Sequence, residues 1–117
     1  MIKAIGLLQR KEGMTHEQFM QHWTEVHAPM AHKLKRVRRY VLNFIVGEPT
    51  RPDIPMLSEF GQIDGIAEVW YESRETYEAH KASPEGKEWH ADGAKFIGRT
   101  KSFLIEEKVI IANREDK

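Results

Sequence analysis

Cysteine is absent from this sequence of 117 residues. Its absence excludes disulfides, thiolate zinc sites, cysteine-ligated iron–sulfur clusters and a cysteine nucleophile. An excess of charge is absent too, because 18 lysines and arginines balance 18 aspartates and glutamates. Binding to nucleic acid or to an anionic membrane relies on surplus cations that neutralise phosphates, so we expect neither partner.

Long hydrophobic runs are also missing. The N-terminal stretch stays apolar for only a few residues before Gln9 and Arg10. No stretch approaches the roughly 18 apolar residues that a membrane helix needs. The stretch also lacks the order of a secretory signal, in which the charge comes first and a longer apolar run follows. We therefore expect a cytoplasmic protein.

The residues that are present suffice for one small domain. A chain of 117 residues fits a single domain of roughly 100–200 residues, and a hydrophobic content of 40% allows a buried core. We expect one domain over residues 1–112 and a polar C-terminal tail over residues 113–117. In so small a core, a ligand cavity would compete with packing for space.

Hydrophobic patterning predicts four strands and two helical regions. The predicted strands are residues 2–9, 37–46, 66–71 and 103–111. One helical region lies between the first two strands, and the other lies between the last two. The order βαββαβ predicts a ferredoxin-like α+β fold, with a four-stranded antiparallel sheet and both helical regions on one face.

The ends of the helices carry local signals. Thr15 and Gln18 form a capping-box pattern at the start of the first helix. Pro29 should end or kink this helix near Ala28, and the alternative is a continuation of one turn over residues 31–34. Ser73 is placed to cap a helix over residues 74–82, and Pro84 is placed to open another. The second helical region is therefore predicted to be broken in two.

The second predicted strand has apolar residues on both of its faces. Tyr40 and Leu42 alternate with Val41 and Ile45. Helices cover only one face of the sheet, so the other apolar face must meet a partner. The simplest partner is a second copy, packed sheet against sheet with a cavity between, and we expect a homodimer. The loop over residues 47–65, which holds three prolines, is long enough to be functional, to form oligomer contacts or to be mobile.

Histidine is the most conspicuous functional candidate. His16, His22, His27 and His32 all lie in the first helical region. Their spacings of six, five and five point consecutive members in different directions on an α-helix, so no shared metal site is expected. His27 lies on the inward face near the helix end. It is either a core-edge histidine bonded to a free helix carbonyl or a general acid or base at a pocket.

A carboxylate inside an apolar strand is the second candidate. Glu68 shares a strand face with Trp70, opposite to Ala67 and Val69. Small residues fit under helices, so Glu68 and Trp70 should face the cavity on the other side. A buried carboxylate needs a partner or water, and the alternative interpretation is an ion pair with Lys3 or Arg38. Tyr40 and Asn43 lie in the neighbouring strand.

These segments together resemble the EthD family of dimeric α/β-barrel proteins. The stretches that carry the resemblance are Gly13–Phe19, His22-Trp23 with His27-Ala28-Pro29, Arg39-Tyr40-Val41, Gly65–Trp70, Ala82–Gly86 and Phe96–Gly98. It extends from Met1 to about Ile110 and implies a dimeric barrel. Within the family, Met14–Phe19, Gly47–Thr50 and Ile63-Asp64 are also similar to the methylmuconolactone methylisomerases, which rearrange a lactone without a cofactor.

This resemblance implies roles for particular residues. The methylisomerase pattern has an active-site histidine at His27 and a tyrosine at Tyr40. It has a further histidine in the long loop, where this chain has Asp53. That difference separates the chain from the methylisomerase pattern.

We therefore expect a pocket between the first helix and the sheet, closed by the long loop, that binds a small, partly apolar catabolic or secondary-metabolic intermediate. The expected chemistry is acid–base isomerase or lyase chemistry without cofactor or metal. The expected catalytic residues are His27, Tyr40 and Glu68, and the expected substrate-binding residues are Trp23, Asn43, Asp53 and Trp70. The alternatives are a cofactor-free monooxygenase, a non-enzymatic ligand-binding accessory protein of a degradation pathway, and a haem-degrading barrel with an axial histidine.

Overall fold

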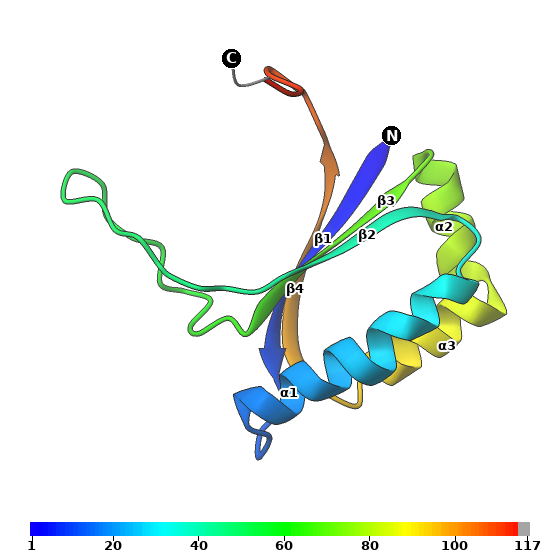
Figure 1. Ribbon diagram of the computed structural model, residues 1–117, viewed down its shortest axis with the longest axis horizontal. Coiled ribbons are helices and arrows are strands. Elements are labelled where there is room, and N and C mark those ends of the chain that lie inside the picture. Colours follow the sequence, from blue (N-terminus) through cyan, green and yellow to red (C-terminus); the bar gives the residue numbers. More distant parts are fainter. Residues whose placement is uncertain (115–117) are drawn as a thin grey trace.

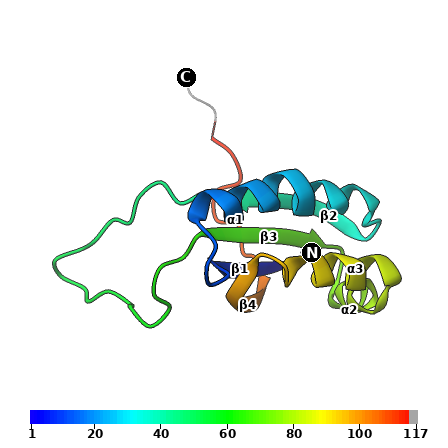
Figure 2. The ribbon, with the colours of Figure 1, turned by 90° about the horizontal axis from the view of Figure 1, so that it is seen from below.

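A computed structural model describes residues 1–114 of the chain. It contains one antiparallel sheet with the strand order β2-β3-β1-β4. The strands are β1 (Ile2–Arg10), β2 (Val37–Asn43), β3 (Gly65–Tyr71) and β4 (Ile97–Glu106). All helices lie on one face of this sheet (Figures 1 and 2). The predicted ferredoxin-like α+β fold is confirmed. Of the predicted polar tail, residues 115–117 lie outside the described part.

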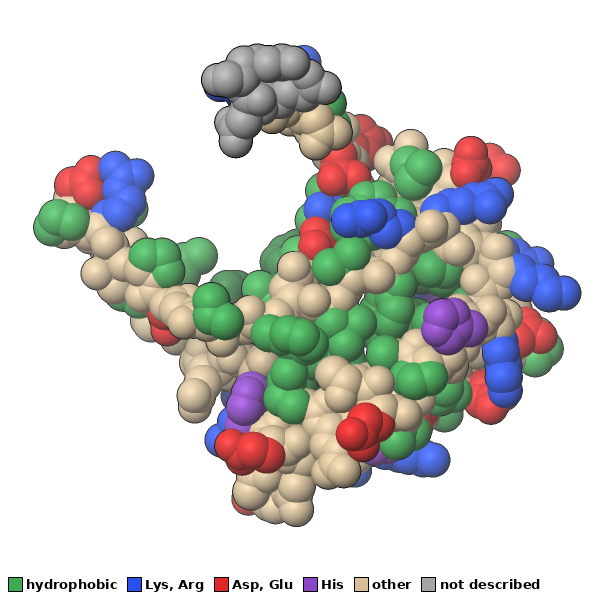
Figure 3. Space-filling model, in the orientation of Figure 1, with side chains coloured by type: hydrophobic (Ala, Val, Ile, Leu, Met, Phe, Trp, Pro, Cys, Tyr) green, Lys and Arg blue, Asp and Glu red, His purple; other side chains and the backbone are tan. Residues whose placement is uncertain are grey.

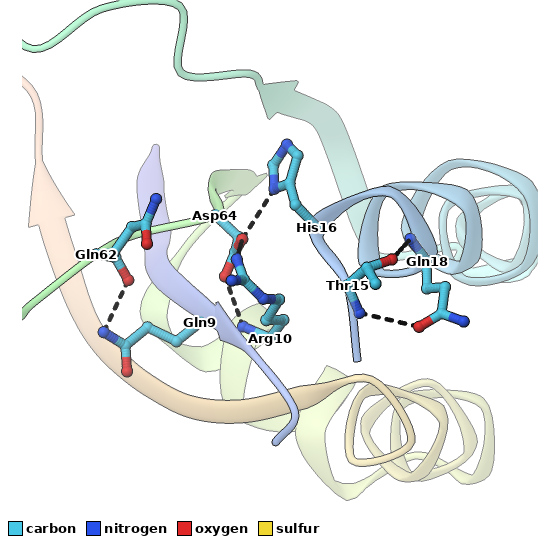
Figure 4. Close-up of polar contacts among 7 residues, drawn as sticks. All are labelled: Gln9, Arg10, Thr15, His16, Gln18, Gln62 and Asp64. Carbon is cyan, nitrogen blue, oxygen red and sulfur yellow. Dashed lines mark hydrogen bonds and ion pairs between the residues drawn. The ribbon is translucent and has the colours of Figure 1, made fainter. Parts of the chain in front are cut away.

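The first helical region changes its hydrogen-bonding pattern twice. It begins as α1 (His16–His22), continues as a π-helical turn η1 (Trp23–His27) and ends as a 3₁₀ segment η2 (Ala28–Lys33). The predicted capping box is confirmed, since Thr15 and Gln18 exchange hydrogen bonds between side chain and backbone at 2.9 and 3.1 Å (Figure 4). Helical structure continues past Pro29 to Lys33, as the alternative of a one-turn continuation predicts, and the helix type changes at Ala28. The region accommodates the proline by the change from π to 3₁₀ geometry, which removes the need for a regular α-helical bond at that position.

The second helical region follows the predicted pattern. The helix α2 (Arg74–Ala82) starts after Ser73, whose side chain accepts a hydrogen bond from the backbone of Thr76. The helix α3 (Pro84–Gly93) has its proline in the first turn, and the Ser83 side chain caps it. These local signals are confirmed because each satisfies backbone N–H groups that have no partner within the helix.

The prediction for the fourth strand is wrong at both ends. It placed the strand at residues 103–111, whereas β4 runs over Ile97–Glu106. Residues 98–102 are polar and carry no apolar alternation. They are extended because they pair with β1, in a register that sets Gly6 opposite Ser102 and Leu8 opposite Thr100. An edge strand with one face uncovered needs few apolar residues. The second strand is also three residues shorter than predicted and ends at Asn43.

The two faces of the sheet differ as the strand patterns predict. Ile2 and Leu8 are buried beneath the helices, whereas Lys3 pairs with Glu68 on the uncovered face. In β3 the small Ala67 and Val69 pack into the core. The interpretation that Glu68 and Trp70 point to the side opposite the helices is confirmed.

The core between sheet and helices is divided into two clusters. One contains Ile2, Leu34, Val69, Tyr71 and Trp89; the other contains Leu8, Phe19, Trp23 and Phe96. The side chains of the fully buried Phe19 and Trp23 contact each other at 5.5 Å between ring centroids.

The long loop over residues 44–64 projects away from the helix layer (Figures 1 and 2). The C-terminal end of the loop is hydrogen-bonded to the end of β1. The carboxylate of Asp64 accepts hydrogen bonds from the backbone and the guanidinium of Arg10, at 2.7 and 2.6 Å, and contacts His16 at 2.8 Å (Figure 4). Burial alone would raise the pKa of Asp64, but these partners hold it below its usual value. The Gln9 side chain also donates to the carbonyl of Gln62. These contacts fix the end of the loop that precedes β3 against β1.

Candidate active site

A cavity of about 660 Å³ lies between the sheet and the helices. Its walls come from both core clusters, from β1 and β4, and from α2 and α3. Most of the lining is apolar, and its polar or aromatic members include Trp23, His27, Tyr40, His80, Trp89 and Ser102. A volume of this size suits a small molecule.

His27 is a buried polar residue of the cavity wall, and a hydrogen bond to Asp92 holds its imidazole in place. It closes the π-helical turn η1 and is 8% exposed. Its Nδ1 lies 2.9 Å from Oδ2 of Asp92 on α3. The Trp89 ring stacks on the imidazole at 5.0 Å with an interplanar angle of 8°, and the Trp89 indole donates a hydrogen bond to the His27 carbonyl at 3.1 Å. The ring is therefore fixed by a carboxylate on one side and by an aromatic plane on its face.

This arrangement leaves Nε2 of His27 as the reactive atom. Since Asp92 is a carboxylate, it assigns the proton to Nδ1 of the neutral ring and the lone pair to Nε2. Within residues 1–114, every fully buried side-chain nitrogen or oxygen has a hydrogen-bond partner, and the hydrogen bonds of His27 engage Nδ1 alone. Nε2 must therefore reach open space, which the cavity provides. An oriented imidazole with a free Nε2 is suited to general base catalysis.

Burial sets the charge state of this pair. Desolvation lowers the pKa of His27 below its ordinary value, and the hydrogen bond to Asp92 opposes the shift only in part. Burial would raise the pKa of Asp92, but the hydrogen bonds from His27 and His22 hold it low. At neutral pH the site therefore contains a neutral imidazole held by an ionised carboxylate.

Tyr40 is another polar residue that lines the cavity with His27. It lies on the helix-facing side of β2 and meets the Trp89 ring edge-on at 5.2 Å between centroids. Burial raises the pKa of Tyr40 to about 12, although the Trp23 indole opposes this shift. The phenol stays protonated at neutral pH, so it serves as a hydrogen-bond donor. The site thus combines a base and a neutral donor in an apolar cavity.

The expectation that consecutive histidines point in different directions is wrong for one pair. His22 and His27 both contact Oδ2 of Asp92, at 3.0 and 2.9 Å. The spacing of five diverges on an α-helix but aligns where the backbone forms a π-turn with i→i+5 hydrogen bonds, as Ala28 does with Trp23. Pro29 stands immediately after this turn, and its missing N–H accompanies the altered pattern.

The predicted site residues separate into three groups. His27, Tyr40 and Trp23 line the cavity. The others are placed elsewhere: Glu68, Asn43 and Trp70 lie on the uncovered face of the sheet, and Asp53 lies in the long loop, paired with Arg51. No residue of the described loop lines the cavity. The expectation that the loop closes the pocket within one chain is therefore wrong in this structure.

Glu68 follows the alternative interpretation of its position. Its Oε2 forms an ion pair with Lys3 at 2.7 Å, and its Oε1 accepts a hydrogen bond from Asn43 at 3.0 Å. The Lys3 hydrogen bond, opposed by desolvation, lowers the pKa of Glu68. Because the sheet stands between Glu68 and His27, Glu68 has no contact with the imidazole inside one protomer.

Two residues of the site were missed by the sequence analysis. Asp92 holds His27, and Trp89 covers the imidazole. A usable signal was present, since Asp92 follows Trp89 by three residues and so lies on the same side of an α-helix. A carboxylate beside a buried aromatic face requires a partner, and a histidine is the natural one.

Across residues 1–114, no group of three or more histidine and carboxylate side chains is arranged to hold a metal ion. In the same part of the chain, no helix combines the length and the apolar composition that crossing a membrane requires.

Comparison with known proteins gives consistent results. The EthD domain matches residues 11–100. The chain is 37% identical, over 93% of its length and 100% of the relative, to 4-carboxymethyl-4-methylbutenolide mutase from Pseudomonas reinekei. An EthD family protein from Bacillus halodurans has a TM-score of 0.74 and 26% identity, covering 92% of this chain and 99% of that one. A dimeric protein with a ferredoxin-like fold from Bacteroides fragilis has a TM-score of 0.62 and 11% identity, covering 91% and 95%. The chain belongs to the EthD family.

Proposed function

We propose that this protein is an isomerase that acts on a small carboxylated butenolide, using acid–base side chains without a cofactor. The observation that carries the proposal is the His27–Asp92 pair, at 2.9 Å, in the wall of an apolar cavity of about 660 Å³. The relationship to a butenolide mutase at 37% identity supports the substrate class. A five-membered lactone with a short acidic arm is small enough for the cavity.

The chemistry uses His27 and Tyr40 among the polar groups that line the cavity. The removable proton lies on the CH2 of the carboxymethyl arm, because its loss forms a C=C bond to C4 as the C4–O bond of the lactone breaks and the ring oxygen leaves as a carboxylate. Nε2 of His27 takes this proton, and the neutral Tyr40 hydroxyl donates a hydrogen bond to the leaving carboxylate oxygen. A carboxylate oxygen then adds to a different carbon to close a new lactone, and the imidazolium, stabilised by Asp92, returns the proton to the neighbouring carbon. No atom or proton is gained or lost overall, so substrate and product have the same composition, as an isomerisation requires.

The proposal is tested by incubating the purified protein with 4-carboxymethyl-4-methylbutenolide. We expect a product of unchanged mass, detected by NMR, with no oxygen consumed at an oxygen electrode. Oxygen consumption with a new hydroxylated product would overturn the proposal in favour of a monooxygenase. Saturable binding of the butenolide with no product would overturn it in favour of a binding protein.

We also propose that two copies associate through the uncovered faces of their sheets. Apolar side chains that the helix layer does not cover are exposed on this face and in the projecting loop. Phe103 on β4 is 44% exposed, and Val46 and Leu57 in the projecting loop are 98% and 74% exposed. Figure 3 shows hydrophobic side chains along this loop. Exposed apolar side chains gathered on an uncovered sheet face are typical of a protein–protein contact surface.

Light scattering tests this association. We expect a mass of twice 13.7 kDa for the native chain. Phe103→Glu places a charge on the uncovered face and should yield the monomer. Lys87→Glu, on the exposed side of α3, is the matched control and should remain dimeric. A native protein whose light-scattering mass at micromolar concentration is that of a monomer would contradict the proposal.

A further inference from the structure

His22 has no part in the acid–base scheme above, yet it contacts the carboxylate that holds the base. Its Nε2 lies 3.0 Å from Oδ2 and 3.2 Å from Oδ1 of Asp92. Its ring stacks on Phe96 at 4.8 Å, and its side chain is 24% exposed. It also lines an outer groove with Gln18 and Glu25, on the side of the helix layer that does not face the cavity.

We propose that His22 is a positioning residue that shares Asp92 with His27, so that the proton held by the catalytic imidazole is controlled from the outer surface of the protein. This proposal rests on the function proposed above and assigns a second histidine to the same site. It stands on geometry, because both rings place a nitrogen within 3.0 Å of the same carboxylate oxygen.

The physical reason is competition for one carboxylate. A neutral His22 donates its Nε2–H to Asp92. The negative charge of Asp92 that stabilises this hydrogen bond is then less available to stabilise a protonated His27. A protonated His22 competes more strongly, because it brings a positive charge to the same oxygen. His22 is partly exposed, so its proton exchanges with solvent without passing through the cavity.

Other charged groups around His27 are few. Asp92 and His90 come from α3, His22 comes from α1, and Lys95 lies 3.9 Å from the other oxygen of Asp92. Tyr40 faces the same cavity from the sheet and is neutral. His22 and His90 both act to lower the pKa of His27, whereas Asp92 raises it. Of the two histidines, His22 is the one hydrogen-bonded to Asp92.

The test uses two substitutions at this position. His22→Phe keeps an aromatic ring against Phe96 but removes the donor to Asp92. His22→Gln keeps an N–H donor of similar reach but cannot become charged. The readout is the titration of the His27 ring, followed by ¹H–¹³C NMR of its Cε1–H group in protein without substrate. His32→Gln, on the exposed surface of η2, is the remote control.

We expect His22→Phe to raise the pKa of His27, because Asp92 is then free to hold the imidazolium. We expect His22→Gln to raise this pKa by less than His22→Phe does, because glutamine keeps the hydrogen bond to Asp92 but not the charge. With a butenolide substrate, His22→Phe should lose activity severalfold on the acid side of the pH profile, whereas activity on the alkaline plateau should be retained.

Several outcomes would overturn the proposal. One is an unchanged His27 titration in His22→Phe; another is an equal change in both variants, which would assign the effect to packing. If His22→Phe does not fold, ¹⁵N spectra of the native protein decide, since the proposal requires Nε2–H in His22 and Nδ1–H in His27. Because the titration needs no substrate, it separates failure of this proposal from failure of the proposed isomerase function.

Discussion

Replacement of His27 by glutamine is expected to lower kcat on a butenolide substrate by about 10²–10⁴-fold, the usual contribution of a general base. Glutamine still donates a hydrogen bond to Asp92, so the fold and the cavity shape should be retained. It lacks a basic nitrogen, so it cannot take the substrate proton. The measurement is initial velocity at saturating substrate, with the folded state of the variant checked by circular dichroism.

The matched control for this experiment is His32→Gln, an exposed histidine in the same helical region. Its turnover should stay close to that of the native protein. A pH profile adds a second check. Because burial lowers the pKa of His27, the base form persists at neutral pH and activity should fall only as the solution becomes acidic. Turnover by His27→Gln within a few-fold of native would remove His27 from the mechanism.

The second large effect concerns the packing behind the cavity. Replacement of Gly65 by alanine is expected to lower the free energy of unfolding by about 3 kcal/mol, as overpacked core sites do. A Cβ at this position would clash with Cζ3 of Trp23 and lie 2.6 Å from its Cη2. The Trp23 ring is fully buried, with Phe19 at 5.5 Å and Phe44 at 5.9 Å, so it has little room to retreat.

Chemical denaturation measures this effect, and Gly47→Ala serves as its control. No heavy atom lies within 4 Å of a Cβ built at Gly47, which stands in the long loop. The two variants share the same chemical change, and only Gly65→Ala meets a side chain. Since Trp23 lines the cavity, its displacement should also weaken ligand binding. Equal stability of the two glycine variants would contradict the packing argument.

Local signals in the sequence predicted much of the fold. The Thr15–Gln18 capping box and the Ser73 cap predicted helix starts, and alternation in β3 predicted which residues face the helices. These features depend on neighbours within a few residues, so they can be recognised without tertiary contacts. Residues 97–102 are the counterexample. They are polar, and only pairing with β1 makes them a strand.

The candidate site was predicted in part. His27, Tyr40 and Trp23 were selected from an apolar helix face and a strand, and all three line one cavity. Glu68 and Asn43 were grouped with them although the sheet separates the two sets. Parity assigns a residue to one face of a strand, but it does not say which face contains the cavity. That choice depends on where the helices leave unfilled space.

The sequence by itself determined the composition of this protein and the order of its elements: no cysteine, balanced charge, the order βαββαβ and an imidazole on an inward helix face. Only the tertiary structure decided which carboxylate meets that imidazole. His27 and Asp92 are 65 positions apart, and their contact requires α3 to pack beside η1. The alignment of His22 with His27 depends on a π-turn. Such a turn is set by long-range packing and by the proline that follows it, so the local spacing of histidines does not reveal it.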